Sequence, residues 1–312
     1  MKLALVGHGS IGSRYKEIIL RDYPEIKNFY IIDTKKSLVN TLRKEGLNCY
    51  ESLDDLKKDS IDLTHGIVAN WGPEHLETAN KLIDLGCKKL IIEKPLSSRK
   101  DQIQIFKQRC FKENIFVTIH HHWNYTKLTK IIRNSEESFN LGKPVGIRLF
   151  GGAVCLSTNG THAFDLSCDL LNSFPKTITA DLELDYINPR DKKLVNIGGM
   201  ASYRMDNNTF IHASLTNTNS QGLVIEIVYR NSSIKLYPNS KLKLFKRDEE
   251  EIKRFGDKIT RYGDMNYVCD LEFDDNPTVK DVLINLIQED IPKVSIQKAE
   301  IAVLMVLGAL IK

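Results

Sequence analysis

Short apolar runs alternate with amphipathic stretches along the first third of the chain. The runs are β-branched or apolar throughout, which is typical of strands buried in a parallel sheet. Pro73 near the start of one stretch and Gly86 after its end are ordinary helix start and stop signals. This alternation predicts βαβ units with right-handed crossovers. The predicted strands are Lys2–Val6, Phe29–Ile32, Leu63–Ala69, Leu90–Glu93 and Ile115–Ile119, and the predicted helices are Ile11–Arg21, Ser37–Glu45, Pro73–Leu85 and Ser97–Glu113.

After about residue 122 the pattern changes to longer strands with little helix between them. Asp206-Asn207-Asn208 separates two such runs and predicts a hairpin, because Asn and Asp tolerate positive φ. The run Leu223–Tyr229 is partly apolar on both faces, so a second cover is needed, and we expect a homodimer or homotetramer through this sheet. The predicted helices are Lys127–Ser138 and His162–Leu171, and the predicted strands are Val145–Phe150, Thr177–Tyr186, Gly199–Met205, Thr209–Thr216, Leu223–Tyr229, Ser233–Leu236 and Lys241–Phe245.

Composition narrows the class of protein. The 312 residues suit one large domain or two ordinary ones, and 42% hydrophobic with 27% charged residues excludes general disorder. The 44 basic and 40 acidic residues are well mixed, which argues against a nucleic-acid partner. The most apolar run, Ile301–Ile311, is about half a membrane span and predicts a buried helix, so we expect no membrane association. Six scattered cysteines without a CxxC pair indicate reduced thiols and a cytoplasmic protein.

A glycine motif follows the first predicted strand and opens the first helix. It reads Gly7-His8-Gly9-Ser10-Ile11-Gly12. Glycine there permits a tight turn, close approach of a pyrophosphate and close helix–sheet packing, while the helix N-terminus offers unpaired N–H groups. Asp33 ends the second strand, where a carboxylate binds ribose hydroxyls and repels a 2′-phosphate. The motif therefore predicts NAD, with NADP as the alternative because Lys35 and Lys36 offset that repulsion.

Three further segments carry a resemblance to a known family. They are Val68-Ala69-Asn70-Trp71-Gly72-Pro73-Glu74-His75, Glu93-Lys94-Pro95-Leu96 and Gly160-Thr161-His162-Ala163-Phe164-Asp165. With the glycine motif, they resemble the glucose–fructose oxidoreductase / inositol dehydrogenase / MocA (Gfo/Idh/MocA) family. The resemblance implies an α/β fold: an N-terminal Rossmann doubly wound parallel sheet, then an α+β domain with an open, largely antiparallel mixed sheet. We place the NAD(P)-binding domain at residues 1–122 and the substrate-binding and oligomerisation domain at residues 123–312.

The resemblance also implies roles for individual residues. Lys94 would lie beside the nicotinamide and the reacting oxygen, where an ammonium stabilises a developing alkoxide. His162 would be the general acid/base, with an ordinary helix-start histidine as the alternative. The expected cofactor contacts are the six motif residues, Asp33, Asn70, Trp71, His75, Glu93 and Lys94, although His75 could instead cap its helix.

One position departs from the family. Many members have an aspartate four residues before the histidine, and this chain has Thr158. A threonine can bind substrate but cannot act as a base, so the inositol-dehydrogenase type of mechanism is in doubt. Asp165, one helical turn after His162, either orients that imidazole or complements the helix dipole.

His120-His121-His122-Trp123-Asn124 follows the predicted strand Ile115–Ile119. Successive strand residues alternate faces, so His120 and His122 would share one. Two histidines without a carboxylate partner make a poor metal site, and we expect no metal. Trp123 suits either a sugar face or the core. The expected substrate contacts are Thr158, Asp165, His121, His122, Trp123 and Asn124.

These observations favour an NAD(P)-dependent oxidoreductase. The substrate class implied by the resemblance is a sugar or nucleotide sugar, and surface-polysaccharide sugar synthesis is our working hypothesis for its role. Two alternatives stay open: a non-catalytic regulator that binds dinucleotide or sugar, and an enzyme that uses tightly bound NAD for a net redox-neutral step.

Overall fold

Two β-sheets organise the chain, one in each of two units. The computed structural model describes residues 1–152, 156–187, 195–216, 220–255, 265–273 and 278–310. The first unit comprises residues 1–125 and 277–303, and the second comprises residues 126–276 and 304–312. This division differs from the linear boundaries 1–122 and 123–312 because a C-terminal segment returns to the first unit.

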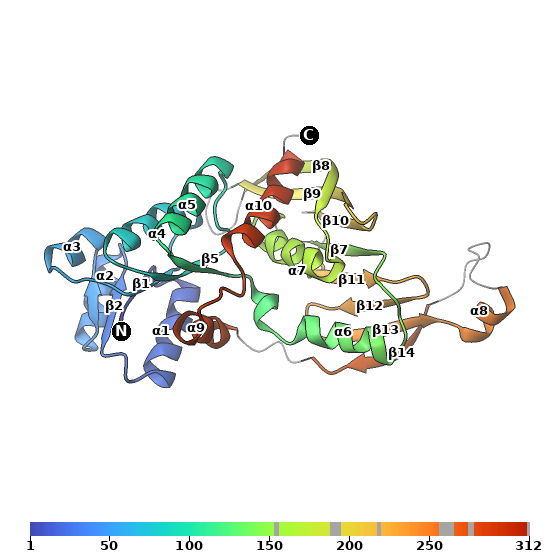
Figure 1. Ribbon diagram of the computed structural model, residues 1–312, viewed down its shortest axis with the longest axis horizontal. Helices are drawn as coiled ribbons and strands as arrows, with labels where there is room; N and C mark the ends of the chain where they lie inside the picture. Colours follow the sequence, from blue (N-terminus) through green and yellow to red (C-terminus); the bar gives the residue numbers. More distant parts are fainter. Residues whose placement is uncertain (153–155, 188–194, 217–219, 256–264, 274–277, 311–312) are drawn as a thin grey trace. The chain divides into compact units, whose positions relative to one another are not determined.

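The first unit is built on a six-stranded sheet in the order β3-β2-β1-β4-β5-β6, and every neighbouring pair is parallel. Helices lie on both faces, with α1 and α9 on one and α4 and α5 on the other (Figure 1). The predicted doubly wound sheet is confirmed. Its strands are β1 (Lys2–Val6), β2 (Asn28–Ile32), β3 (Asn48–Tyr50), β4 (His65–Val68), β5 (Lys89–Glu93) and β6 (Phe116–His120), and its helices are α1 (Ser10–Asp22), α2 (Lys36–Lys44), α3 (Leu53–Lys58), α4 (His75–Asp84), α5 (Lys100–Lys112) and α9 (Val279–Gln288), with 3₁₀ turns at Gly72–Glu74 and His122–Tyr125.

Helix α9 completes this unit from the far end of the sequence. Its apolar side, with Val282, Leu283 and Leu286, is buried, and the helix packs on β5, β6 and α1. Lys280 forms an ion pair of 3.1 Å with Asp22 at the end of α1. The Ile119 N–H then donates to the Val294 carbonyl at 3.0 Å, so the returning segment is bonded to β6 itself.

The second unit is built on an eight-stranded sheet in the order β14-β13-β12-β11-β7-β10-β9-β8. The pair β7–β10 is parallel, and the other pairs of this sheet are antiparallel. The predicted largely antiparallel mixed sheet is therefore confirmed. Its strands are β7 (Gly146–Gly152), β8 (Pro175–Ile187), β9 (Val195–Met205), β10 (Phe210–Thr216), β11 (Val224–Val228), β12 (Ser232–Leu236), β13 (Leu242–Arg247) and β14 (Met265–Leu271), and its helices are α6 (Leu128–Ser138), α7 (Thr161–Leu171), α8 (Glu249–Phe255) and the end of α10 (Ile296–Leu310), with a π-helical turn at Leu156–Gly160.

Helices α6, α7 and α10 cover one face of this sheet. Phe164 of α7 packs edge-on against Tyr203 of β9 with ring centroids 5.1 Å apart, and the Tyr203 hydroxyl donates to the Met305 carbonyl of α10. The Tyr229 hydroxyl donates to Glu136 of α6 at 2.8 Å. The predicted hairpin joins β9 to β10, with Asn208 at a φ of 65°.

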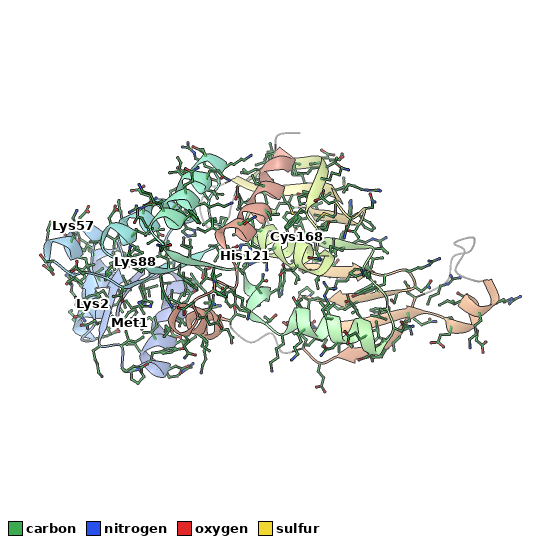
Figure 2. The ribbon with its side chains drawn as sticks, viewed as in Figure 1. Met1, Lys2, Lys57, Lys88, His121 and Cys168 are labelled. Atoms are coloured by element: carbon green, nitrogen blue, oxygen red, sulfur yellow. The ribbon has the colours of Figure 1, made fainter. Side chains whose placement is uncertain are left out.

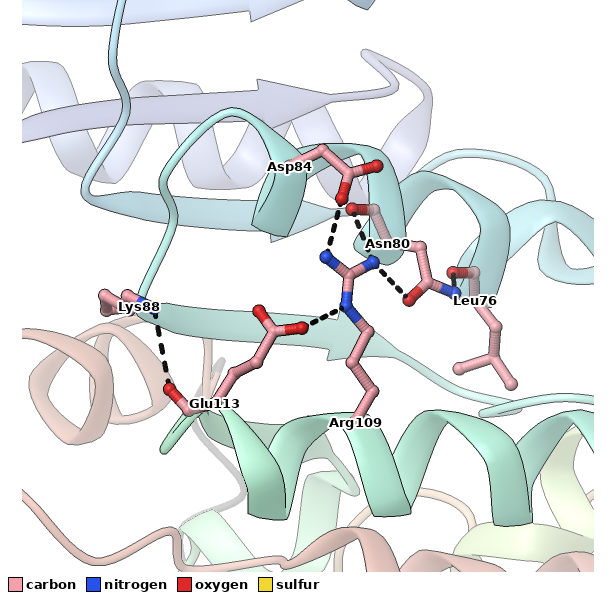
Figure 3. A network of polar contacts seen from close by, with 6 residues as sticks. All are labelled: Leu76, Asn80, Asp84, Lys88, Arg109 and Glu113. Atoms are coloured by element: carbon pink, nitrogen blue, oxygen red, sulfur yellow. Dashed lines mark hydrogen bonds and ion pairs between the residues drawn. The ribbon is translucent and has the colours of Figure 1, made fainter.

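Helices α4 and α5 are tied by one arginine (Figure 3). Arg109 of α5 donates to the Asn80 side chain at 2.9 Å and to Asp84 at 2.6 Å, both on α4, and to Glu113 at 2.9 Å. The planar guanidinium thus meets three acceptors at once, because its N–H donors are spread over a rigid fork, whereas those of an ammonium all lie on one nitrogen.

Two further expectations concern the chain as a whole. Among the helices of the described chain, none has the length and apolar content that crossing a membrane requires. Cys49, Cys87, Cys110, Cys168 and Cys269 form no disulfide with one another, and Cys155 lies outside the described residues.

Candidate active site at the carboxyl edge of the parallel sheet

The candidate site of the first unit lies at the carboxyl edge of its sheet. The strand order reverses at β1, whose neighbours are β2 and β4, and ligands of doubly wound sheets bind at such a reversal. Lys2 and Lys88, which precede or begin strands, lie at the opposite edge from His121, which follows β6 (Figure 2).

The glycine motif forms a turn whose three glycines have different surroundings. Gly7 has a φ of +92°, and a Cβ there would lie 2.5 Å from the Asn70 nitrogen. A Cβ on Gly12 would overlap the Gly7 carbonyl. A Cβ on Gly9, in contrast, would meet nothing within 4 Å. Gly7 and Gly12 are therefore required by the turn itself, and Gly9 borders open space at the start of α1.

The residues around this open space fit a dinucleotide. Gly9 is the N-cap of α1, and no side chain caps it, so the first N–H groups of the helix are available to an anion. Asp33 accepts from the His8 N–H at 2.8 Å and from the Lys35 N–H at 2.9 Å, which holds its carboxylate at the end of β2. Among the described residues, the buried Nε2 of His8 and Oδ1 of Asn70 have no hydrogen-bond partner. The pKa of His8 is lowered by burial and by Lys16.

The loop after β4 is braced by His75. This imidazole is buried, and its Nδ1 and Nε2 face the carbonyls of Pro95 at 2.8 Å and Asn70 at 3.2 Å. Burial lowers the pKa of His75, so the neutral ring donates one proton between them. Both ring nitrogens contact backbone carbonyls of the protein. Any effect of His75 on a cofactor therefore acts through the two loops that it joins, which contain Asn70 and Pro95. Trp71 at the same loop is 43% exposed.

Glu93, the last residue of β5, points into the unit. Its carboxylate accepts from the Tyr15 hydroxyl at 3.0 Å and contacts His120 Nδ1 at 2.7 Å. Burial acts to raise the pKa of Glu93, but His120, Tyr15 and the Lys94 ammonium outweigh it, so the pKa is lowered. The side chain predicted as a cofactor contact therefore holds the end of β5 in place, with the half-buried Lys94 directly after it.

The segment after β6 gathers the expected substrate contacts of the first unit. His121 is buried and His122 half-buried, and Trp123 packs edge-on against His122. His120 and His122 both reach the Thr278 hydroxyl, although β6 ends at His120 and His122 begins a 3₁₀ turn. Asn124 accepts from Lys298 Nζ at 2.6 Å. No group of three His, Cys, Asp or Glu side chains suited to a metal occurs in the described part of the chain.

Sequence reasoning missed Tyr15, Thr278 and Lys298. Tyr15 lies within the first helix, and the other two come from the segment that returns to this unit. A tyrosine on the apolar side of the first predicted helix was a usable signal for a role of Tyr15, but not for its contact with Glu93, 78 residues away. For Thr278 and Lys298 the chain offers no local signal, because only the topology brings them to β6.

The remaining predicted residues lie in the second unit. His162 occupies the first turn of α7 and is half-buried, and Asp165, one turn on, is buried. Thr158 is in the π-helical turn that precedes α7, and its side chain lies outside the described residues. Lys94 thus belongs to the first unit and His162 to the second.

Comparison with known proteins finds a family model that matches the N-terminal part of the chain. Residues 1–121 match a model described as an oxidoreductase family with an NAD-binding Rossmann fold. This segment is therefore similar to the Gfo/Idh/MocA family. The resemblance expected from the glycine motif and the Glu93-Lys94-Pro95 segment is thereby confirmed. A comparison with curated proteins found no match.

Solved structures share the fold of this chain over nearly its whole length. A UDP-N-acetylglucosamine 3-dehydrogenase from Acidithiobacillus ferrooxidans has a TM-score of 0.73 at 13% identity, covering 99% of this chain and 97% of that one. A putative NADPH-dependent oxidoreductase from Desulfitobacterium hafniense has a TM-score of 0.76 at 12% identity, covering 99% and 94%. The super-repressor mutant of Gal80p from Saccharomyces cerevisiae has a TM-score of 0.70 at 14% identity, covering 99% and 95%.

Proposed function

We propose that this protein is an NAD(P)-dependent oxidoreductase that interconverts a hydroxyl and a carbonyl group of a sugar or nucleotide sugar. The observation that carries the proposal is the open space at Gly9, bordered by the uncapped start of α1 and by the fixed Asp33 carboxylate. Lys94 follows β5 at the same edge of the sheet. When bound, NAD would supply the hydride acceptor.

The chain's own residues supply binding and proton chemistry. The helix α1 N–H groups would bind the pyrophosphate, and Asp33 would favour an unphosphorylated ribose. Lys94 would donate a hydrogen bond to the substrate oxygen and stabilise the alkoxide as it forms. His162 would remove the hydroxyl proton in the oxidative direction and return it in the reductive one.

The substrate class rests on the family and on the fold shared with a UDP-N-acetylglucosamine 3-dehydrogenase. We include a role in surface-polysaccharide sugar synthesis within the proposal, because nucleotide sugars are the precursors that such synthesis consumes.

The test is oxidation of NADH and NADPH across a panel of keto-sugars and keto-sugar nucleotides. Lys94→Ala should lose at least a hundredfold in kcat while binding NADH as wild type does, because its hydrogen bond strengthens in the transition state. Lys112→Ala, at an exposed position on α5, is the matched control and should retain activity. Equal activity of the Lys94→Ala and Lys112→Ala variants would refute the assigned role of Lys94.

A non-catalytic regulator is the second candidate, favoured by Thr158 in place of an aspartate and by the fold shared with Gal80p. Binding of NADH without turnover on any compound would support it. A third candidate retains NAD for a redox-neutral step. Dinucleotide that survives extensive dialysis of the purified protein, detected by mass spectrometry after denaturation, would distinguish this candidate from an ordinary dehydrogenase.

A further inference from the structure

A chain of polar side chains runs through the interior of the first unit. The Glu93 carboxylate contacts His120 Nδ1 at 2.7 Å, and His120 Nε2 lies 2.8 Å from the Thr278 hydroxyl. The same hydroxyl lies 3.0 Å from His122 Nδ1. Glu93, His120 and Thr278 are buried, whereas His122 is only half-buried. The chain therefore connects the interior with the segment that follows β6.

The Thr278 hydroxyl between two imidazole nitrogens has one proton to donate. If it donates to His120 Nε2, then His122 Nδ1 must carry a proton and donate to the hydroxyl oxygen. If it donates to His122 Nδ1, then His120 Nε2 must carry the proton instead. In both arrangements His120 Nδ1 donates to Glu93. The two arrangements contain the same number of protons. They differ only in the position of one proton, which resides on His122 in the first and on His120 in the second.

We infer that Thr278 passes a proton between His122 and the buried Glu93–His120 pair. In the inward direction, His122 starts as an imidazolium. Its Nδ1–H bond breaks as a new O–H bond forms at Thr278, and the former hydroxyl proton forms an N–H bond at His120 Nε2, which leaves His122 neutral with its proton on Nε2. No electrons are lost or gained. The product is a His120 imidazolium against the Glu93 carboxylate, an ion pair in a buried site.

Three further side chains, Tyr15, Tyr125 and Lys94, lie close to the Glu93–His120 pair. The Tyr15 hydroxyl of α1 donates to the same Glu93 oxygen, and the Tyr125 ring packs edge-on against His120 at 5.7 Å. Lys94, directly after β5, is a nearby cation. The negative charge of Glu93 is thus held by two hydrogen bonds, which makes the pair able to accept and return a proton without leaving an unpaired buried charge.

The use of the chain rests on the proposed function. Oxidation of a hydroxyl releases a proton at the substrate, and the half-buried His122, which we expect to contact substrate, would receive it and transfer it inward. Thr278, His120 and Glu93 act through His122 and are positioning residues in this scheme.

The proposal is tested by nuclear magnetic resonance of isotope-labelled histidine side chains in the full chain. In wild type, the signals of His122 Nδ1 and His120 Nε2 should change together, over the same pH interval. Thr278→Val keeps the shape but removes the hydroxyl, and the two changes should become independent. Thr278→Ser keeps the hydroxyl and should retain the shared transition. His122→Gln identifies the His122 signals.

Independent titration of the two rings in wild type would overturn the proposal, as would a shared transition that persists in Thr278→Val. The wild-type measurement decides even if Thr278→Val fails to fold. Once a substrate is known, Thr278→Val should lower kcat about tenfold or more with KM unchanged, and Thr278→Ser should restore it. The resonance experiment needs no substrate, so failure of the proposed oxidoreductase function is distinguishable from failure of the proton chain.

Discussion

At the scale of single residues, the glycine turn separates what folding requires from what a ligand requires. Gly7 needs its positive φ and its lack of a side chain because the Asn70 backbone lies against it. Gly9 has a φ of −78°, which any residue adopts, and open space beside it. The same motif thus contains two glycines, Gly7 and Gly12, that the fold requires, and a third, Gly9, whose lack of a side chain matters only to an approaching molecule.

This contrast gives the first prediction. Gly9→Ala should leave the free energy of unfolding within about 0.5 kcal/mol of wild type but weaken NADH binding about tenfold, because the methyl group enters the open space. Gly7→Ala should lower the free energy of unfolding by about 2 kcal/mol or more. Urea unfolding and fluorescence titration with NADH measure the two effects. Unchanged NADH affinity in Gly9→Ala would contradict a pyrophosphate at this position.

His65 at the start of β4 predicts a dependence of stability on pH. Its pKa is lowered to about 4 by burial and by the nearby Lys89, while an unfolded histidine titrates near about 6.5. As pH falls through that interval the unfolded chain binds a proton that folded His65 does not, so the free energy of unfolding falls. The contribution of His65 to the free energy of unfolding is fully present above about pH 6.5.

Urea unfolding at several pH values, in wild type and in His65→Asn, measures this contribution. The difference between the two proteins should shrink as the pH decreases from about 7.5 to about 5. A difference that stays constant over this range would show that His65 binds protons equally well in both states.

At the scale of elements, Arg109 makes α4 and α5 a single layer. Arg109→Lys should lower the free energy of unfolding by about 1–2 kcal/mol, because Asn80, Asp84 and Glu113 each accept from a different guanidinium nitrogen and a lysine has only one. Arg99→Lys on the same chain segment is the matched control, since Arg99 pairs with Asp101 at an exposed site, and such pairs contribute little. Equal effects of the two substitutions would contradict a special role for Arg109.

The elements that the sequence predicts are those with a long apolar period. Strand β1 is predicted to the residue, and the other predicted strands of the parallel sheet start or end within two residues of those observed. Strand β3 has three residues, too few to show a period, and was missed. Strand β14 is exposed along most of its length, so it lacks the apolar alternation that predicts a strand.

The residues of the candidate site likewise fall into two groups, those that the sequence predicts and those whose contacts only the structure shows. Residues that chemistry demands beside a strand end, such as Lys94 and Asp33, are recognisable from the motif and its place. The inward direction of Glu93 and the bracing role of His75 follow from neighbours distant in sequence, such as Tyr15 and Pro95. No local pattern contains those neighbours.

At the scale of the whole molecule, the face of the second sheet that α7 does not cover combines polar and apolar rows. Paired positions across all eight strands form one polar row: Thr179, Ser202, His212, Arg148, Glu226, Lys235, Lys243 and Asp270. Beside it lie Phe150 and Met200, which are 44% and 46% exposed. We propose that a second copy of the chain covers this face, as the two apolar faces of the Leu223–Tyr229 run predict.

Phe150→Asp should convert the proposed oligomer to monomers, because it places a charge in an apolar contact. Phe111→Asp on α5 is the control, since Phe111 is 87% exposed in the other unit and should not change the assembly. Light scattering after size-exclusion chromatography measures the mass. A wild-type monomer, or an oligomer unaffected by Phe150→Asp, would exclude this face as the interface.

The return of α9 to the first unit has a consequence for synthesis in the cell. Helix α9 begins roughly 160 residues after β6 ends, and at about 5–20 residues per second the ribosome needs roughly 10–30 seconds to reach it. During that interval β5 and β6 lack the cover that Val282, Leu283 and Leu286 later provide. The nascent chain therefore carries an unfinished domain through the translation of the second unit, and this apolar surface is where a chaperone would be expected to bind first.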